Sequence, residues 1–216
     1  MEVQLSTIFF FLISPAVLLV STTAGQALPP ASDDSATVGQ AFPPSYDDTY
    51  YIRASCEVTR YPETCFASLS NFSGVIHHDA GRLAKAAIHV ALHNATHVAN
   101  YVSNMSRQQD SNNTRKFAAV RDCSSVFEDA VEQIHNSGKE MKRLGWTGES
   151  VRFQLSNVQT WMSSALTNED TCVDGFDGVA DDDGVKADVC GRVVAVMQVT
   201  SNALALVNRY ADTVSA

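Results

Sequence analysis

The chain has 216 residues, of which 24 are acidic and 15 basic, and its formal net charge at pH 7 is −9. This charge argues against nucleic acid as a partner, because phosphate binding needs clustered Lys and Arg side chains. It also predicts repulsion of acidic polysaccharides and attraction of a basic protein partner.

The amino terminus predicts a secreted protein. Residues 8–20, IFFFLISPAVLLV, are apolar but too few to span a bilayer, and small residues follow in STTAGQA, as at a signal-peptide cleavage site. We therefore expect a signal peptide at residues 1–27 and no membrane-spanning segment after it. Four N-glycosylation sequences agree with passage through the secretory route, at Asn71, Asn94, Asn104 and Asn112.

Residues 28–50 are predicted to form a disordered tail rich in Pro and Asp. The sequence QALPPASDDS returns as QAFPPSYDDT, and the tail has no basic residue. Such a composition cannot bury enough apolar surface to become ordered. A proline-rich contact with a partner is the alternative interpretation. We expect one folded domain, residues 51–216, which has the length of a single-core domain.

The domain is predicted to begin with a helical hairpin. The sequence YIRASCEVTRYPETCFASLS reads as two short helices that meet at Arg60-Tyr61-Pro62, since Pro favours the first turn of a helix. Cys56 and Cys65 would then lie close enough to form a disulfide.

Four long amphipathic helices are predicted after the hairpin. Apolar residues recur three and four positions apart in residues 83–105, 113–144, 151–172 and 185–214, which is the helical period. Ser150 is the expected N-cap of the third helix. No stretch alternates like a β-strand. The predicted fold class is all-α, an antiparallel four-helix bundle preceded by a short disulfide-stapled α-helical hairpin.

The other three cysteines fall on these long helices. A bridge between Cys123 and Cys172 would close a loop of about 50 residues and contribute roughly 4 kcal/mol. Cys190 is expected to be a buried small hydrophobe without a partner. Four cysteines permit three connectivities, and a fifth adds more, so the spacing alone leaves the pairing open.

Three features resemble the plant invertase and pectin methylesterase inhibitor family: the early C-x8-C hairpin, Asp122-Cys123, and WMSSALTNEDTCVDGF at residues 161–176. The resemblance covers residues 51–216. It implies a four-helix bundle with an amino-terminal hairpin, and disulfides Cys56–Cys65 and Cys123–Cys172. Inhibitors of pectin methylesterase often keep an unpaired cysteine in the last helix, which matches Cys190.

The resemblance implies that the protein is an enzyme inhibitor located in the plant apoplast or cell wall. Inhibitors of acid invertase typically carry Pro-Lys-Phe after the second bundle helix, where this chain has LGWTGESVRF. The sequence TNEDTCVDGF favours pectin methylesterase as the target, bound non-covalently in a 1:1 complex that occludes its substrate cleft. Acid invertase is the alternative target.

Two further alternatives come from the same resemblance. The pro-region of a pectin methylesterase shares this domain, but such enzymes continue through a basic processing site into a catalytic domain, whereas this sequence ends at NRYADTVSA. A structural wall protein could keep the fold without any enzyme target. The target-interface candidates are polar positions away from the apolar stripes, namely Glu128, Glu132, Gln159, Ser163 and Thr171.

No motif indicates catalysis, a cofactor or a metal. The sequence has no G-x-S-x-G, H-E-x-x-H or glycine-rich phosphate loop. His89, His93 and His97 share one helical strip, which we expect to be solvated; two zinc ligands or a pH sensor are the alternatives. The loop FDGVADDDG fits no EF-hand register and is expected to be a solvated acidic loop.

Overall fold

The computed structural model describes residues 44–108, 115–145 and 149–215, all within the unit formed by residues 41–216. The predicted signal peptide, most of the predicted tail and Asn112 lie outside the described residues. In the described part of the chain every regular element is a helix.

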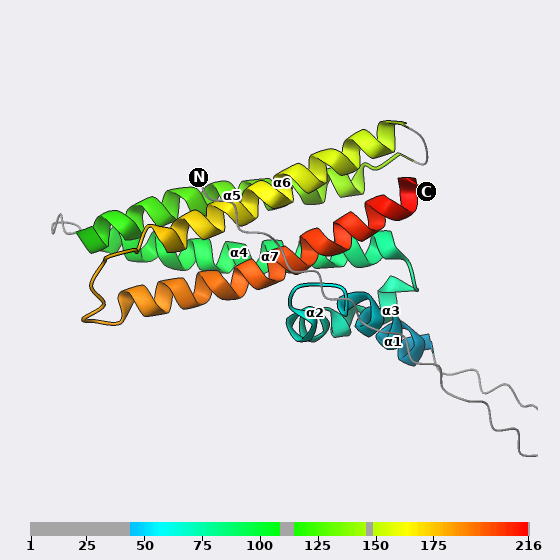
Figure 1. The fold of residues 1–216 in the computed structure, drawn as a ribbon, viewed down its shortest axis with the longest axis horizontal. Helices are drawn as coiled ribbons and strands as arrows, with labels where there is room; N and C mark the ends of the chain where they lie inside the picture. Colours follow the sequence, from blue (N-terminus) through cyan, green and yellow to red (C-terminus); the bar gives the residue numbers. More distant parts are fainter. Residues whose placement is uncertain (1–43, 109–114, 146–148, 216) are drawn as a thin grey trace, which may run out of the picture. The chain divides into compact units, whose positions relative to one another are not determined.

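Four long helices form an antiparallel bundle: α4 (Ala80–Gln108), α5 (Arg115–Lys142), α6 (Glu149–Asp174) and α7 (Val185–Ser215). Among these four, each helix packs against two others, so that α4 contacts α5 and α7, and α6 contacts the same two helices. Figure 1 shows the four running back and forth along a common direction. The predicted all-α bundle is confirmed.

The core lies along the apolar stripes that the sequence period predicted. Helix α4 contributes mainly alanines, which allow its neighbours to approach closely, while α5 and α6 contribute large side chains such as Phe127 and Met162. One predicted end is wrong, because α6 begins at Glu149 and Ser150 lies inside it. The start of α4 has a side-chain cap, since the carboxylate of Asp79 accepts a 2.6 Å hydrogen bond from the N–H of Arg82.

The amino-terminal hairpin consists of α1 (Pro44–Cys56) and α2 (Pro62–Leu69), joined by the Cys56–Cys65 disulfide. A short 3-10 turn, η1 (Ser70–Phe72), and α3 (Ser73–Ile76) lead from it to α4. Pro62 occupies the first turn of α2, as expected.

Helix α1 begins earlier than the sequence predicted. We expected the tail to continue to residue 50, but the helix starts at Pro44, and Asp48 is only 2% exposed. Its carboxylate accepts hydrogen bonds of 3.1 Å from the N–H groups of His77 and His78. The composition of the tail could not reveal this anchor, because its partners lie about thirty positions further along the chain.

The hairpin docks on α7 through a paired amide. The side chain of Asn202, 3% exposed, accepts a hydrogen bond of 3.1 Å from the N–H of Tyr61 and donates one of 2.9 Å to its carbonyl. Thr64 also donates to Gln198 at 3.1 Å. These bonds hold the Arg60-Tyr61-Pro62 corner against the bundle.

Helix α7 is more apolar than we expected of any segment after the signal peptide. By length and composition Val185–Val214 could span a membrane, with a mean hydropathy of 1.4. In the structure, however, α7 packs against α4, α6 and the hairpin, and its side chains Val189, Val193, Val207 and Ala203 are fully buried. Contact with three neighbours accounts for its apolar composition, so we assign it to the bundle core.

Candidate functional site

Helices α5 and α6 are fastened together at both ends. At one end the Cys123–Cys172 disulfide joins them, with both cysteines buried. At the other end the side chain of Gln154 donates to the carbonyl of Arg143 at 3.1 Å and accepts from the N–H of Gly145 at 3.0 Å. A surface on this pair is therefore preorganised, and little conformational entropy is lost when a partner binds it.

The solvent side of α6 carries a row of hydroxyl groups, which we call the hydroxyl strip. It follows the helix period and has no charged member; its residues are Ser156, Thr160, Ser163, Ser164, Thr167 and Thr171. The first five, together with Gln159, line a shallow hollow. All six are exposed except Ser164, which is half-buried.

The threonines of the hydroxyl strip donate their protons inward. Thr160 and Thr171 donate to the backbone carbonyls four residues earlier at 2.8 Å, and Thr167 does so at 3.2 Å. Each oxygen keeps a lone pair that can accept a hydrogen bond from outside. The strip therefore suits a partner that presents N–H donors, including Lys and Arg.

The five predicted interface residues do not form one cluster. Glu128 and Glu132 are exposed on α5, and Ser163 and Thr171 belong to the hydroxyl strip of α6. Gln159 is half-buried, and its Nε2 donates to Oδ1 of Asn208 on α7 at 2.9 Å. Its amide group links α6 to α7 and is not free for a partner in this conformation.

Phe153 is a surface residue that the sequence reasoning missed. It lies in the first turns of α6 and is 69% exposed. Exposed aromatic side chains are frequent anchors of protein interfaces. The signal was present in the sequence, since Phe153 falls between Val151 and Leu155 of the buried stripe and is out of register with both.

The TNEDTC sequence has an inner and an outer side. Thr171 points outward, whereas Glu169 and Cys172 are buried. Oε1 of Glu169 accepts a 2.8 Å hydrogen bond from Thr200 of α7, and its Oε2 has no hydrogen-bond partner. Burial raises the pKa of Glu169 to about 8, against a smaller lowering effect of the Thr200 bond. The carboxyl group is thus neutral at mildly acidic pH.

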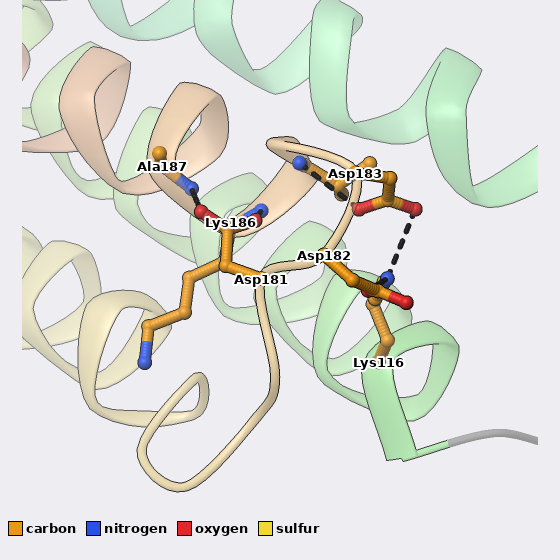
Figure 2. A network of polar contacts seen from close by, with 7 residues as sticks. Lys116, Asp181, Asp182, Asp183, Lys186 and Ala187 are labelled. Carbon is orange, nitrogen blue, oxygen red and sulfur yellow. Dashed lines mark hydrogen bonds and ion pairs between the residues drawn. The ribbon is translucent and has the colours of Figure 1, made fainter.

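The aspartate loop between α6 and α7 caps a helix. Asp181 accepts hydrogen bonds from the N–H groups of Lys186 and Ala187, at 2.9 and 3.0 Å, at the start of α7. Lys116 of α5 pairs with Asp182 at 2.6 Å and with Asp183 at 2.9 Å, as Figure 2 shows. The hydrogen bonds from Lys116 lower the pKa of both carboxyls. The loop therefore does more than carry solvated charge.

The histidines of α4 and Cys190 are outside the α5–α6 pair. His89, His93 and His97 are exposed, and among the described residues no three His, Cys, Asp or Glu side chains are grouped to hold a metal ion. Cys190 is free, as expected, but it is half-buried where we expected a buried side chain. Burial still raises the pKa of its thiol.

The three described glycosylation sequences differ in exposure. Asn71 is exposed on η1, and Asn104 is exposed on α4, where its Oδ1 accepts from Arg107. Asn94 is half-buried, and its Nδ2 donates to the carbonyl of Val90 at 2.8 Å. Asn71 and Asn104 are therefore the exposed acceptors, and glycosylation at all of these sites stays a prediction.

Comparison with known proteins identifies relatives over most of the chain. Residues 50–206 match the family model "Plant invertase/pectin methylesterase inhibitor". The "21 kDa protein" of Daucus carota is 40% identical over 74% of this chain and 83% of its own length. "Pectinesterase inhibitor 9" of Arabidopsis thaliana is 38% identical over 75% of this chain and 81% of its own length. "Pectinesterase inhibitor 11" of the same plant is 36% identical over 95% of this chain and 95% of its own length.

The fold has solved counterparts. The crystal structure of a mutant form of a pectin methylesterase inhibitor from Arabidopsis matches 71% of this chain and 92% of its own, with a TM-score of 0.57 and 19% identity. At this identity the match supports the bundle architecture alone.

Proposed function

Because this chain belongs to the plant invertase/pectin methylesterase inhibitor family, we propose that it inhibits pectin methylesterase by covering the enzyme's substrate cleft. The observation that carries the proposal is the family match over residues 50–206, together with relatives of up to 38% identity that are named pectinesterase inhibitors. No covalent step is involved, and one inhibitor binds one enzyme.

The inhibitory surface is the hydroxyl strip of α6, with Phe153 as its apolar anchor. Ser163 and Thr171 lie within it, and the exposed Glu128 and Glu132 of α5 are proposed as separate contacts with the enzyme. An aromatic anchor beside acceptor groups is the composition expected of a non-obligate interface. The two fastenings of α5 to α6 keep the surface rigid and favour tight binding.

The protein is proposed to act in the cell wall. Residues 1–27 have the composition of a signal peptide, and two disulfides suit an oxidising compartment. The net charge of −9 attracts a basic enzyme at long range.

The test is a titration of purified mature protein against pectin methylesterase and, separately, against acid invertase at mildly acidic pH. We expect loss of methylesterase activity that is complete near one equivalent, with invertase unaffected. Inhibition of invertase alone would reverse the assignment, and inhibition of neither would indicate a structural wall protein.

The surface is tested with two variants and a matched control. Phe153→Ser and Ser163→Arg should each weaken inhibition by about tenfold or more, because they remove the anchor and place a bulky cation in the hollow. Val194→Ser, which removes an apolar side chain that is 42% exposed on α7, should leave inhibition unchanged. If Phe153→Ser and Ser163→Arg inhibit the enzyme as strongly as the Val194→Ser control, the contact surface lies elsewhere.

A further inference from the structure

The net charge of the chain conceals a strong separation of charge. Helix α4 has three cationic side chains and three histidines but no Asp or Glu. The aspartates of the loop between α6 and α7 lie at the end of the bundle where α5 begins, beside Lys116. In Figure 1 this loop and the junction between the start of α4 and the end of α5 are at opposite ends of the bundle.

A groove at the second of these ends brings five basic side chains together. It lies between the first turns of α4 and the last turns of α5 and has a volume of about 120 Å³. Its basic lining consists of Lys85, His89, His135, Lys139 and Lys142. All five are exposed, and within the described residues none of the three lysines has an acidic side chain within 4 Å. Glu132 and Glu140 of α5 are not among the lining residues.

The groove has an apolar floor. Ile88 and Met141 are almost fully buried beneath it, and Leu92 is half-buried at its side. Gly138 keeps the floor open, because a side chain there would rise beside Ile88, whose Cγ2 lies 3.6 Å from the position of an added Cβ. Cationic walls over an apolar floor suit a ligand with regularly placed anionic groups and apolar faces between them.

The helix dipole explains the position of only some of these basic side chains. Lys139 and Lys142 lie in the last turn of α5, where cations interact favourably with the helix dipole. Lys85 and His89 lie in the second and third turns of α4, near its amino-terminal end, where the helix dipole does not favour cations. Both sets line the same groove, so a single anionic ligand can contact both.

We propose that this groove binds the unesterified uronate chain of pectin, the product of the enzyme that the protein inhibits. The inference rests on the proposed function, since removal of methyl esters creates carboxylates where inhibitor and enzyme meet. Lysines pair with the carboxylates, the histidines donate hydrogen bonds, and the apolar floor contacts the C–H faces of the sugar rings. A neutral methylated chain lacks the charges that the groove recognises.

Binding of the uronate chain would hold the inhibitor on de-esterified pectin, in addition to its contact with the target enzyme. The groove lies between α4 and α5, whereas the hydroxyl strip belongs to α6, so one molecule can hold the polysaccharide and the enzyme together. Binding to both confers a local concentration advantage even when the contact with the sugar chain is weak. Inhibitor would therefore accumulate where pectin has already lost its esters.

The experiment measures binding of the mature protein to unesterified oligogalacturonate at low salt, with highly methylated oligogalacturonate in parallel. The variant combines Lys85→Gln, Lys139→Gln and Lys142→Gln. The control combines Arg121→Gln, Lys186→Gln and Arg209→Gln, which removes the same charge from other exposed or partly exposed sites on α5 and α7. Circular dichroism verifies that both fold.

We expect the wild type to bind the unesterified chain, the groove variant to bind it about tenfold more weakly, and the control to bind within about twofold of the wild type. The wild type should bind the methylated chain weakly, with an affinity no higher than that of the groove variant for the unesterified chain. Equal weakening in variant and control would reduce the effect to net charge and overturn the proposal.

A second pair of measurements separates this inference from the proposed function. The groove variant should still inhibit pectin methylesterase as the wild type does. A wild-type protein that binds the sugar chain but does not inhibit the enzyme would refute the inhibitor assignment only. A wild-type protein that inhibits the enzyme but does not bind the sugar chain would refute the groove assignment only. Equally tight binding of a single-stranded DNA oligonucleotide through the same lysines would mean that the groove binds any polyanion, contrary to the uronate assignment.

Discussion

The hydroxyl of Thr200 donates a 2.8 Å hydrogen bond to Oε1 of Glu169 inside the bundle, and this is the polar contact that links α6 to α7 in the core. The other carboxyl oxygen has no partner, and burial raises the pKa of Glu169 from 4.5 to about 8. The folded protein therefore retains a proton that the unfolded chain releases above pH 4.5.

The first prediction concerns the pH dependence of stability. Because the folded pKa of Glu169 is raised, its contribution is fully present below pH 4.5 and is lost as the pH rises through about 8. Glu169→Gln keeps the shape without the ionisation. The wild type should lose up to about 5 kcal/mol relative to this variant across that window. Urea unfolding at several pH values measures the difference; a difference that does not change with pH would contradict the assignment.

The second prediction concerns the Cys123–Cys172 bridge. It spans 49 residues of sequence, so replacing both cysteines by Ser should cost about 4 kcal/mol and lower Tm by about 10 °C. Cys190→Ser is the matched control, since Cys190 is free and half-buried, and it should change Tm by no more than about 2 °C. Calorimetry under non-reducing conditions measures Tm for both variants. If the double Ser variant and Cys190→Ser lower Tm by similar amounts, the bridge adds little stability.

The third prediction concerns the anchor of α1. His77 and His78 have positive φ angles of 50° and 55°, a conformation that costs energy for residues other than Gly. The buried carboxylate of Asp48 compensates by accepting both of their N–H groups. Asp48→Ala should cost about 1–3 kcal/mol and expose these amides to hydrogen exchange. Substitution of His77 by Gly should preserve their protection, because Gly adopts positive φ freely.

The fourth prediction uses two glycines that differ in backbone conformation alone. An added Cβ would meet nothing within 4 Å at either Gly184 or Gly191. Gly191 lies inside α7, so Gly191→Ala should stabilise the protein by about 0.5–1 kcal/mol. Gly184 has a φ of +77°, so Gly184→Ala should destabilise it by a similar amount or more. Chemical unfolding of both variants gives the two signs; the same sign in both would show that φ does not decide the effect.

Much of the fold followed from local pattern. The apolar period predicted the four long helices, and Pro62 predicted the corner of the hairpin. The end of the predicted tail was wrong because burial of Asp48 depends on backbone groups of His77 and His78, which composition cannot reveal. By length and composition alone α7 could span a membrane, but in the fold its apolar surface packs against three neighbours.

The candidate surfaces were less predictable. Helical period identified Ser163 and Thr171 as outward positions but could not indicate that Gln159 is bonded to Asn208 across two helices. The exposure of Phe153 could have been predicted, because its position is out of register with the buried stripe of α6. The aspartates around Asp182 looked like solvated charge until their contacts with Lys116 and the start of α7 were known.

The sequence by itself determined the helices and the family, because the apolar period and the family's motifs each depend on residues near one another in the chain. Tertiary structure alone decided which charges meet. Lys85 and Lys142 are far apart in sequence and belong to an acidic protein, yet the antiparallel packing of α4 on α5 brings them to one groove. A net charge sums over the surface, whereas a ligand experiences only the charges within about a Debye length of it.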